Sequence, residues 1–425
     1  MKICHTKDGR SNMPGHKNIL KAADFSVSQD DICLAQKTLE PILRKTELIE
    51  STFFSKEYGN RVFLKPENFQ VTGSFKIRGA YYKISKLSEE EKSKGVIAAS
   101  AGNHAQGVGY AAQMLGVKAT IVMPETTPII KVEATKKFGV QVVLHGDTYD
   151  DACRKAYELE AENGYVFVHP FDDIDVMLGQ GTVALEVLKE LDDVDKILVP
   201  IGGGGLISGI ALAAKMLKPG IKIIGVEPEG ACCIARSLDE NKVTELKKVD
   251  TMADGVAVKT PGDLTFQVIK EFVDEVVTVS DSDILEAILL LMERHKMITE
   301  GAGALSVAGL KKLAPEDKNV VCVISGGNID ISTISAIINR ALVSRGRQFC
   351  FTVNLPDKPG ELLNVAKILA DLRANVIKLE HNQSKVMDRF KLVQLEITVE
   401  TNGHDHVRQI QKELKRHGFE IIKIY

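Results

Sequence analysis

The sequence predicts an α/β protein with two open, mostly parallel sheets, flanking helices and a smaller C-terminal domain. From about residue 61 to 345, apolar runs of strand length alternate with amphipathic stretches of helix length. Several of these runs end in a glycine-rich turn. After residue 347 the order changes to strand, helix, two strands, helix and strand. Strands separated by helices pair in parallel, whereas the second order is ferredoxin-like.

The composition fits a soluble, globular protein of two or three domains. The chain has 425 residues, 44% of them hydrophobic, and a formal net charge of −3. The chain therefore lacks the excess of positive charge that is typical of nucleic-acid-binding proteins, and no apolar run has the length of a membrane span. Seven scattered cysteines without a Cys-x-x-Cys pair argue against a disulfide framework or a zinc site. The N-terminus lacks a secretory signal, so we expect a cytoplasmic protein.

Local patterning places the elements of the first sheet. Residues 1–28 are polar and aperiodic, so we expect an extension without regular structure. A helix is predicted over Gln29–Leu39 and a strand over Arg61–Lys65. A smaller subdomain, roughly residues 70–168, follows. Its strands and helices are expected to alternate over Val96–Ala99, Ala105–Leu115, Ala119–Met123, Ile129–Phe138, Gln141–Leu144 and Tyr149–Asn163.

The same alternation continues into a second sheet and then changes in the tail. The second sheet is expected over Gly179–Leu191, Lys196–Pro200, Leu206–Met216, Lys222–Val226, Val320–Ile324 and a helix from Ile331. The tail is expected to fold over Phe349–Leu355, Pro359–Leu372, Asn375–Glu380, Lys391–Ile397, His404–His417 and Glu420–Ile424. Two α/β sheets leave a cleft between them, and ligands of open α/β sheets bind outside the carboxyl ends of the strands.

The stretch Ser74-Phe75-Lys76-Ile77-Arg78-Gly79-Ala80 places a lysine in a largely uncharged run at the start of a predicted helix. We expect Gly73 to form the turn before this helix and Ser74 to cap it. Burial disfavours the ammonium form, and a neutral amine is what a Schiff base with an aldehyde cofactor needs. Taken alone, the stretch is more typical of a surface lysine whose ammonium reaches solvent.

A run of four glycines, Gly202 to Gly205, lies between a predicted strand and a predicted helix that begins at Leu206. Backbone N–H groups in such a turn can hold a phosphate at the helix N-terminus. The unit also resembles the dinucleotide-binding fingerprint, in which a strand, a glycine turn and a helix are followed by an acidic residue, here Glu227. Its glycines, however, do not follow G-x-G-x-x-G. A plain tight turn is the third interpretation.

Two further strand ends carry polar residues. Ser100-Ala101-Gly102-Asn103-His104 opens a helix, where its N–H groups can hold a carboxylate and Asn103 can donate to an oxygen on a cofactor ring. Ser325-Gly326-Gly327-Asn328 follows an apolar strand, and its hydroxyl can meet a ring nitrogen. In isolation, the first motif is more typical of a helix cap and the second of a strand-end turn.

Three more titratable residues need a role. Glu300 precedes a helix and either interacts with its dipole or lines a cofactor site. His104 starts a helix and His169 ends a strand, positions where a histidine is more often structural, so neither is assigned as a catalytic base.

Taken together and in this order, the motifs closely resemble those of the fold-type II pyridoxal-phosphate enzymes, whose fold is tryptophan-synthase-β-like. Within them the chain is most similar to the threonine dehydratases, or threonine ammonia-lyases. The resemblance covers about residues 29–345 and implies a catalytic domain over 29–347. The tail, 348–425, is similar to an ACT domain, with Leu355–Leu362 as its strand-to-helix turn. Such domains bind an amino-acid effector or mediate assembly.

The resemblance implies a role for each motif. Lys76 forms the Schiff base with pyridoxal 5′-phosphate and later takes the Cα proton. The remaining groups bind the substrate carboxylate (Ser100, Ala101, Gly102, Asn103, His104), the cofactor phosphate (Gly202, Gly203, Gly204, Gly205, Leu206), the pyridine nitrogen (Ser325), and the cofactor ring (Asn103 at its hydroxyl, Glu300 beside it). Serine racemases carry a serine at the position of Ala101, so racemisation is disfavoured here. Some relatives bind a cation where this chain has Cys233, so no metal is predicted.

The implied reaction is deamination of L-threonine to 2-oxobutanoate and ammonia, with L-serine as a slower substrate and control by an amino acid bound to the tail. A homodimer or homotetramer is expected. The alternatives are an L-serine dehydratase or another fold-type II lyase, an NAD-dependent oxidoreductase built on the Gly202–Glu227 unit, and a non-catalytic amino-acid sensor.

Overall fold

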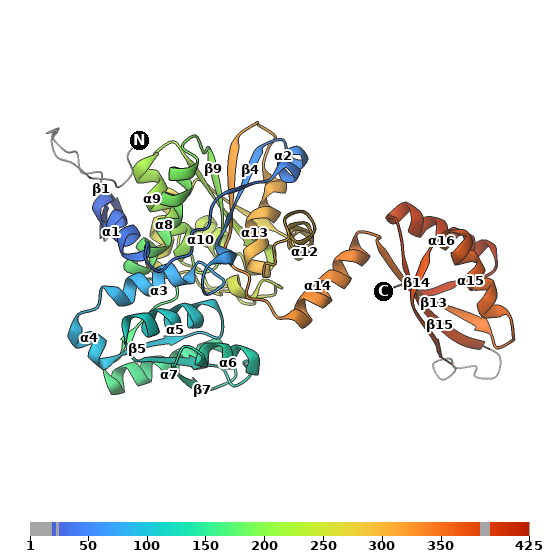
Figure 1. The fold of residues 1–425 in the computed structure, drawn as a ribbon, viewed down its shortest axis with the longest axis horizontal. Coiled ribbons are helices and arrows are strands. Elements are labelled where there is room, and N and C mark those ends of the chain that lie inside the picture. Colours follow the sequence, from blue (N-terminus) through green and yellow to red (C-terminus); the bar gives the residue numbers. More distant parts are fainter. Residues whose placement is uncertain (1–18, 23–24, 383–391, 425) are drawn as a thin grey trace. The chain divides into compact units, whose positions relative to one another are not determined.

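The computed structural model describes residues 19–22, 25–382 and 392–424 (Figure 1). The chain divides into two compact units, Met1–Ile329 and Asp330–Tyr425. None of the helices in the described residues is long and apolar enough to span a membrane.

A six-stranded sheet forms the larger half of the first unit, in the order β11-β10-β9-β12-β4-β3. The strands β4, β9, β10, β11 and β12 pair in parallel, and the short β3 is antiparallel to β4. Their bounds are β3 Ile49–Glu50, β4 Arg61–Pro66, β9 Lys196–Pro200, β10 Lys222–Pro228, β11 Glu275–Val279 and β12 Asn319–Ile324. The central strands β9 and β12 are buried along their whole length, as their continuous apolar runs require.

A second, four-stranded sheet forms the smaller half, in the order β7-β6-β5-β8, and all of its pairs are parallel. Its strands are β5 Val96–Ala99, β6 Ala119–Met123, β7 Gln141–Leu144 and β8 Val166–Phe167. Figure 1 shows this sheet with α5, α6 and α7 as a separate lobe of the first unit. The expectation of two mostly parallel sheets is therefore confirmed.

Helices cover both sheets of the first unit. They are α1 Gln29–Leu39, α2 Thr52–Tyr58, α3 Lys76–Ser85, α4 Glu89–Lys94, α5 Asn103–Leu115, α6 Ile129–Lys136, α7 Tyr149–Asn163, α8 Ile174–Glu190, α9 Gly205–Leu217, α10 Cys233–Glu240, α11 Asp263–Phe272, α12 Asp281–Leu290 and α13 Gly301–Gly309. Helix α3 packs against both α5 and α8, so it joins the two halves. The larger core is built mainly from α8, α9 and the strands beneath them.

The second unit has the predicted ferredoxin-like order. After the helix α14 Ile331–Ser344 come β13 Gln348–Pro356, α15 Glu361–Asp371, β14 Asn375–Asn382, β15 Leu392–Glu400, α16 His404–Arg416 and β16 Ile421–Ile424. The antiparallel sheet has the order β14-β15-β13-β16. Alternate residues of β13 and β15 point into a core shared with α15 and α16, among them Phe351 and Ile397.

Some sequence expectations were wrong. Two strands, Ile19–Ala22 and Phe25–Ser28, pair antiparallel within the extension expected to lack regular structure. Residues 1–18 lie outside the described part of the chain. Helix α8 begins five residues before the predicted Gly179, because Asp173 accepts hydrogen bonds from the first turn and caps it. Contacts group α14 with the C-terminal unit, so a domain boundary at 347 stays a prediction.

Candidate active site

Backbone hydrogen bonds join the lysine motif to the strand end that carries Ser325. The N–H of Phe75 donates to the carbonyl of Ser325 at 3.1 Å, and the N–H of Gly327 donates to the carbonyl of Gly73 at 2.9 Å. Ser74 and Gly326 form an antiparallel bridge between them. Lys76 and Ser325 are therefore held next to each other, although they are far apart in the sequence.

Lys76 is the first residue of α3, and its amine is turned toward the segment that leads from β8 into α8. Nζ donates to the carbonyl oxygen of Pro170 at 2.6 Å. Burial lowers the pKa of Lys76 to about 8, while the charge of Glu300 acts in the opposite direction. Near physiological pH a minor but appreciable fraction of this amine is therefore neutral, and the neutral form is the one that acts as a nucleophile.

The expected cap at Ser74 is wrong. The N-cap of α3 is Phe75, which makes no side-chain capping bond. Ser74 is buried, its backbone is bridged to Gly326, and its hydroxyl has no hydrogen-bond partner among the described residues. Gly73 does form the predicted turn, with φ of +73°.

Asn103 brings three motifs together. Its Nδ2 donates to Glu300 Oε1 at 2.6 Å, and its Oδ1 accepts from Asn328 Nδ2 at 2.8 Å. The same Asn328 nitrogen donates to the carbonyl of Thr72 at 2.7 Å. Side chains from the ends of β5 and β12 and the start of α13 therefore meet beside the turn that carries Lys76.

Glu300 lies inside this group rather than at a solvent-exposed helix end. Burial raises its pKa to about 7, against the stabilising hydrogen bond from Asn103. Ser325 is buried, and its hydroxyl donates to the carbonyl of Ala302 at 3.3 Å. This long bond leaves the hydroxyl free to serve another acceptor.

The glycine run forms the N-terminus of α9. Gly204 is the N-cap, with φ of +96°. Among the described residues, no hydrogen bond uses the N–H groups of Gly202 to Leu206. Phe171 packs on this turn so closely that a Cβ at Gly203 or Gly205 would collide with it. Free donors grouped at a helix N-terminus fit a phosphate.

The loop Ser100–Asn103 opens α5 at the carboxyl end of β5. The Ser100 hydroxyl accepts from the N–H of Gly102 at 3.2 Å, and Ala101 and Gly102 are half-buried. His104 lies apart from them, since its ring is buried and its Nε2 bonds the carbonyl of Val168 at 2.7 Å. Burial lowers the pKa of His104 to about 3, so the ring is neutral, and its Nε2–H is used by the carbonyl of Val168.

Residues beyond the predicted set take part in this geometry. His169 Nδ1 accepts from the N–H of Asp172 at 2.7 Å and shapes the turn that presents Pro170 to Lys76. The motif that contains Asn328 stands out in the sequence, but no role is predicted there for the Asn328 side chain. The contacts of Pro170 and Phe171 follow only from the fold, because each joins segments far apart in the chain.

Glu227 does not fit the dinucleotide interpretation. It is fully buried, and its two oxygens accept from the N–H groups of Ile234 and Ala235 at 2.9 and 2.8 Å. Burial raises its pKa to about 7. Both oxygens hold the first turn of α10 inside the protein, so neither is exposed to a ribose hydroxyl. Within the described residues, no group of three or more His, Cys, Asp or Glu is placed to hold a metal ion.

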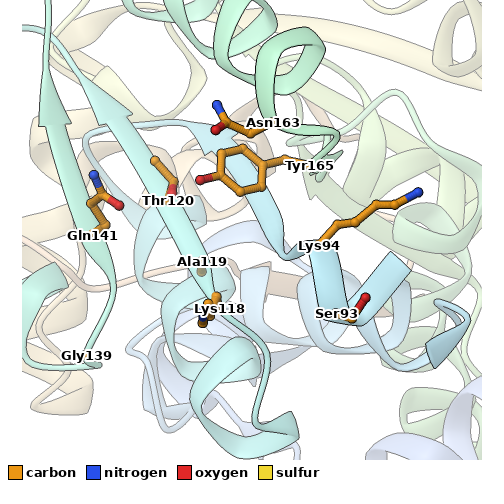
Figure 2. Close-up of a pocket in the computed structure, with 9 residues that line it drawn as sticks. All are labelled: Ser93, Lys94, Lys118, Ala119, Thr120, Gly139, Gln141, Asn163 and Tyr165. Carbon is orange, nitrogen blue, oxygen red and sulfur yellow. The ribbon is translucent and has the colours of Figure 1, made fainter. Parts of the chain in front are cut away.

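Figure 2 shows a pocket of about 440 Å³ that lies elsewhere. It is lined by residues at the amino ends of β6 and β7, among them Ala119 and Gln141, and by Lys94 and Tyr165. None of the residues joined to Lys76 lines it. Ligands of open α/β sheets bind at the carboxyl ends of strands, so we assign no role to this pocket.

Four features fit an aldehyde cofactor that carries a phosphate. Lys76 offers a partly neutral amine, and, within the part of the chain that the structure describes, the N–H groups of the glycine run and the buried hydroxyl of Ser74 have no partner. Gly326 leaves space beside Asn103 and Glu300, where a Cβ would collide with the carboxylate. Residues 39–326 match the family of pyridoxal-phosphate dependent enzymes. The chain belongs to this family.

Relatives within this family are similar over most of the chain. L-threonine ammonia-lyase of Thermotoga maritima is 46% identical over 396 residues, which cover 93% of this chain and 99% of the relative. The solved structure of processed threonine deaminase isoform 2 from Solanum lycopersicum has a TM-score of 0.70 and 38% identity, covering 78% of this chain and 99% of that one. Maize serine racemase has a TM-score of 0.70 and 37% identity, covering 74% and 98%.

Proposed function

We propose that this enzyme deaminates L-threonine to 2-oxobutanoate and ammonia. L-serine, which would give pyruvate, is proposed as a slower substrate. The observation that carries the proposal is the partly neutral amine of Lys76, held beside the Asn103–Glu300 pair and the Ser325 strand end. The Thermotoga relative, an L-threonine ammonia-lyase that matches nearly the whole chain, supports the choice of substrate.

The chain's own residues bind and orient the reactants. When bound, the cofactor supplies an electron sink for the charge that develops at Cα. The N–H groups of Gly202 to Leu206 hold its phosphate, and Ser325 faces its ring nitrogen. A neutral serine does not keep that nitrogen protonated, which favours prompt loss of the β-hydroxyl. The loop Ser100–Asn103 holds the substrate carboxylate at a helix N-terminus.

Lys76 has two tasks in this proposal. It holds the cofactor before substrate arrives, and its amine then takes the proton from Cα. Its lowered pKa suits a base that works near neutral pH. Loss of the β-hydroxyl as water is followed by addition of water and release of ammonia, so the net products are one 2-oxobutanoate and one ammonia.

The runner-up is an L-serine dehydratase or another lyase of the same family. Both reactions need the same lysine and the same carboxylate loop, so the site alone does not separate them. Relative kcat/KM values on L-threonine and L-serine do separate them. A higher value on L-threonine supports the proposal, and a higher value on L-serine replaces it.

The C-terminal unit is proposed as an ACT domain that binds an amino-acid effector. Its strand-to-helix turn runs over Leu355–Leu362, and Gly360 caps α15 with φ of +98°. Leu363 at the start of α15 is exposed.

We also propose a cytoplasmic homodimer or homotetramer. Deamination measured with and without isoleucine tests the effector, and a change in KM or kcat supports it.

A further inference from the structure

The side chain of Asn328 has both of its donor hydrogens in use. Nδ2 donates to the carbonyl of Thr72 at 2.7 Å and to Asn103 Oδ1 at 2.8 Å. An asparagine amide nitrogen carries two hydrogens, so these two bonds exhaust it. Asn328 therefore links the turn before Lys76 to the residue that opens α5.

This contact sets the direction of the Asn103 amide. Because Oδ1 accepts from Asn328, the Asn103 nitrogen points to the other side, where it donates to Glu300 Oε1 at 2.6 Å. If the amide were reversed, two NH₂ groups would face each other at Asn328. Two carbonyl-type oxygens would also face each other at Glu300. Both contacts favour the same orientation.

Glycines make room for this arrangement. A Cβ at Gly73 would collide with the side chain of Asn328, and a Cβ at Gly326 would collide with Glu300 and lie 3.2 Å from Asn103 Nδ2. The space that Gly326 leaves open is thus bordered by the Asn103 donor. The turn that carries Lys76 and the strand end that carries Ser325 both depend on small residues at these two points.

We propose that Asn328 is a positioning residue, which holds the Asn103 amide so that its nitrogen donates to the ring hydroxyl oxygen of the cofactor. This inference rests on the proposed function, in which Asn103 faces that oxygen. A donor in this place stabilises the deprotonated oxygen, whereas the amide oxygen of a reversed Asn103 would repel it. Asn328 itself acts only through Asn103.

The test uses binding of pyridoxal 5′-phosphate, not turnover. In a Lys76→Ala background the cofactor cannot attach covalently, so its dissociation constant reports the remaining contacts. Asn328→Asp is nearly the same size but cannot donate from the carboxylate, so the Asn103 amide is expected to turn over. We expect the dissociation constant to rise by about tenfold to a hundredfold, the range for a hydrogen bond to a charged group.

A double-mutant cycle separates positioning from a direct or a merely structural role. Asn103→Ala should weaken binding, and adding Asn328→Asp to it should change the dissociation constant by less than about twofold. If the two effects multiply, Asn328 does not act through Asn103 and the inference fails. It also fails if Asn328→Asp alone leaves binding unchanged.

Three controls keep the outcome clear. Asn163→Asp, at the end of α7, should not change cofactor binding. Thermal unfolding without cofactor should show folded protein, and Asn328→Ala replaces Asn328→Asp if the latter does not fold. A second measurement uses protein with Lys76 intact. The pKa read from the pH dependence of the bound cofactor's absorbance should be about one unit higher in Asn328→Asp than in wild type. None of these readouts uses L-threonine, so a wrong substrate assignment would leave this inference standing.

Discussion

Asn103 donates to Glu300 at 2.6 Å, which joins the first residue of α5 to the N-cap of α13. The pair lies close enough to Lys76 for the carboxylate to raise the pKa of the amine, against the larger effect of burial. The protonation of Lys76 therefore depends on a residue that is far from it in the sequence.

The first prediction concerns the wild-type pH profile. The pKa of Lys76 is lowered to about 8, and only the neutral amine attacks an aldehyde. The rate at which cofactor-free protein takes up pyridoxal phosphate should therefore rise with pH and reach half of its maximum near pH 8. The visible absorbance of the bound cofactor measures this rate. A rate that rises only near pH 10 would contradict the lowered pKa.

The second prediction removes the carboxylate. Glu300→Gln keeps the size of the side chain but deletes the charge that raises the pKa of Lys76. The midpoint of the uptake profile should move below pH 8, because burial then acts without opposition. Glu229→Gln, an exposed residue outside the site, is the matched control and should leave the midpoint in place. An unchanged midpoint in Glu300→Gln would show that Glu300 carries no charge beside the lysine, and an upward shift would contradict the direction of its effect.

The third prediction concerns a buried ionic network behind the lysine. Arg78, two residues after Lys76, bonds Glu67 through Nε at 2.7 Å and Glu186 through Nη1 at 2.6 Å. Lys65 bonds the same Glu186 at 2.6 Å. Arg78 and Glu67 are fully buried, and their ion pair raises the pKa of the guanidinium. Breaking such a network leaves an uncompensated buried charge.

Arg78→Ala should accordingly lower the free energy of unfolding by about 3–5 kcal/mol in urea titrations. Arg61→Ala is the control, because Arg61 forms an exposed ion pair with Glu50 at 3.6 Å. It should cost no more than about 1 kcal/mol. Equal losses in the two variants would mean that burial of the network contributes nothing to stability.

The fourth prediction tests the structural role of Glu227. Its folded pKa, about 7, exceeds its ordinary value of 4.5, so the folded protein binds this proton more tightly than the unfolded chain. The stability that Glu227 contributes is complete below about pH 4.5 and is lost as the pH rises through 7. Glu227→Gln should remove this part of the pH dependence and leave cofactor binding unchanged.

Urea unfolding at pH 5 and pH 8 measures that difference, with Glu229→Gln as the exposed control. If Glu227→Gln keeps the wild-type pH dependence, the buried carboxyl is not its source. If Glu227→Gln instead abolishes cofactor binding, Glu227 takes part in the cofactor site and does not only stabilise the first turn of α10.

Much of the fold was predictable because its signals are local. Continuous apolar runs marked the buried strands β9 and β12, and alternation marked β13 and β15. The N-terminal hairpin over Ile19–Ala22 and Phe25–Ser28 was missed, because each strand has only four residues and the alternation of Phe25-Ser26-Val27-Ser28 is too short to stand out. Helix α11 was not predicted although it carries apolar residues at helical spacing.

The site was predictable as a set of motifs but not as a set of contacts. The order of the motifs around Lys76, Asn103 and Ser325 indicated the family. The bonds from Lys76 to Pro170 and from Asn328 to Asn103 span 94 and 225 residues, and no local pattern predicts them. Ser74 failed as a cap because its backbone is bridged to Gly326.

The central claim is that Lys76 is the residue on which deamination of L-threonine depends. The direct measurement is release of 2-oxobutanoate and ammonia from L-threonine by purified wild type, Lys76→Ala and Lys86→Ala. Lys86 is exposed near the other end of the same helix and is the matched control. We predict equal release of both products by wild type and Lys86→Ala, and a loss of at least about a thousandfold in Lys76→Ala, since a base and an anchor are removed together. Full activity in Lys76→Ala, or none in wild type loaded with pyridoxal phosphate, would contradict the claim.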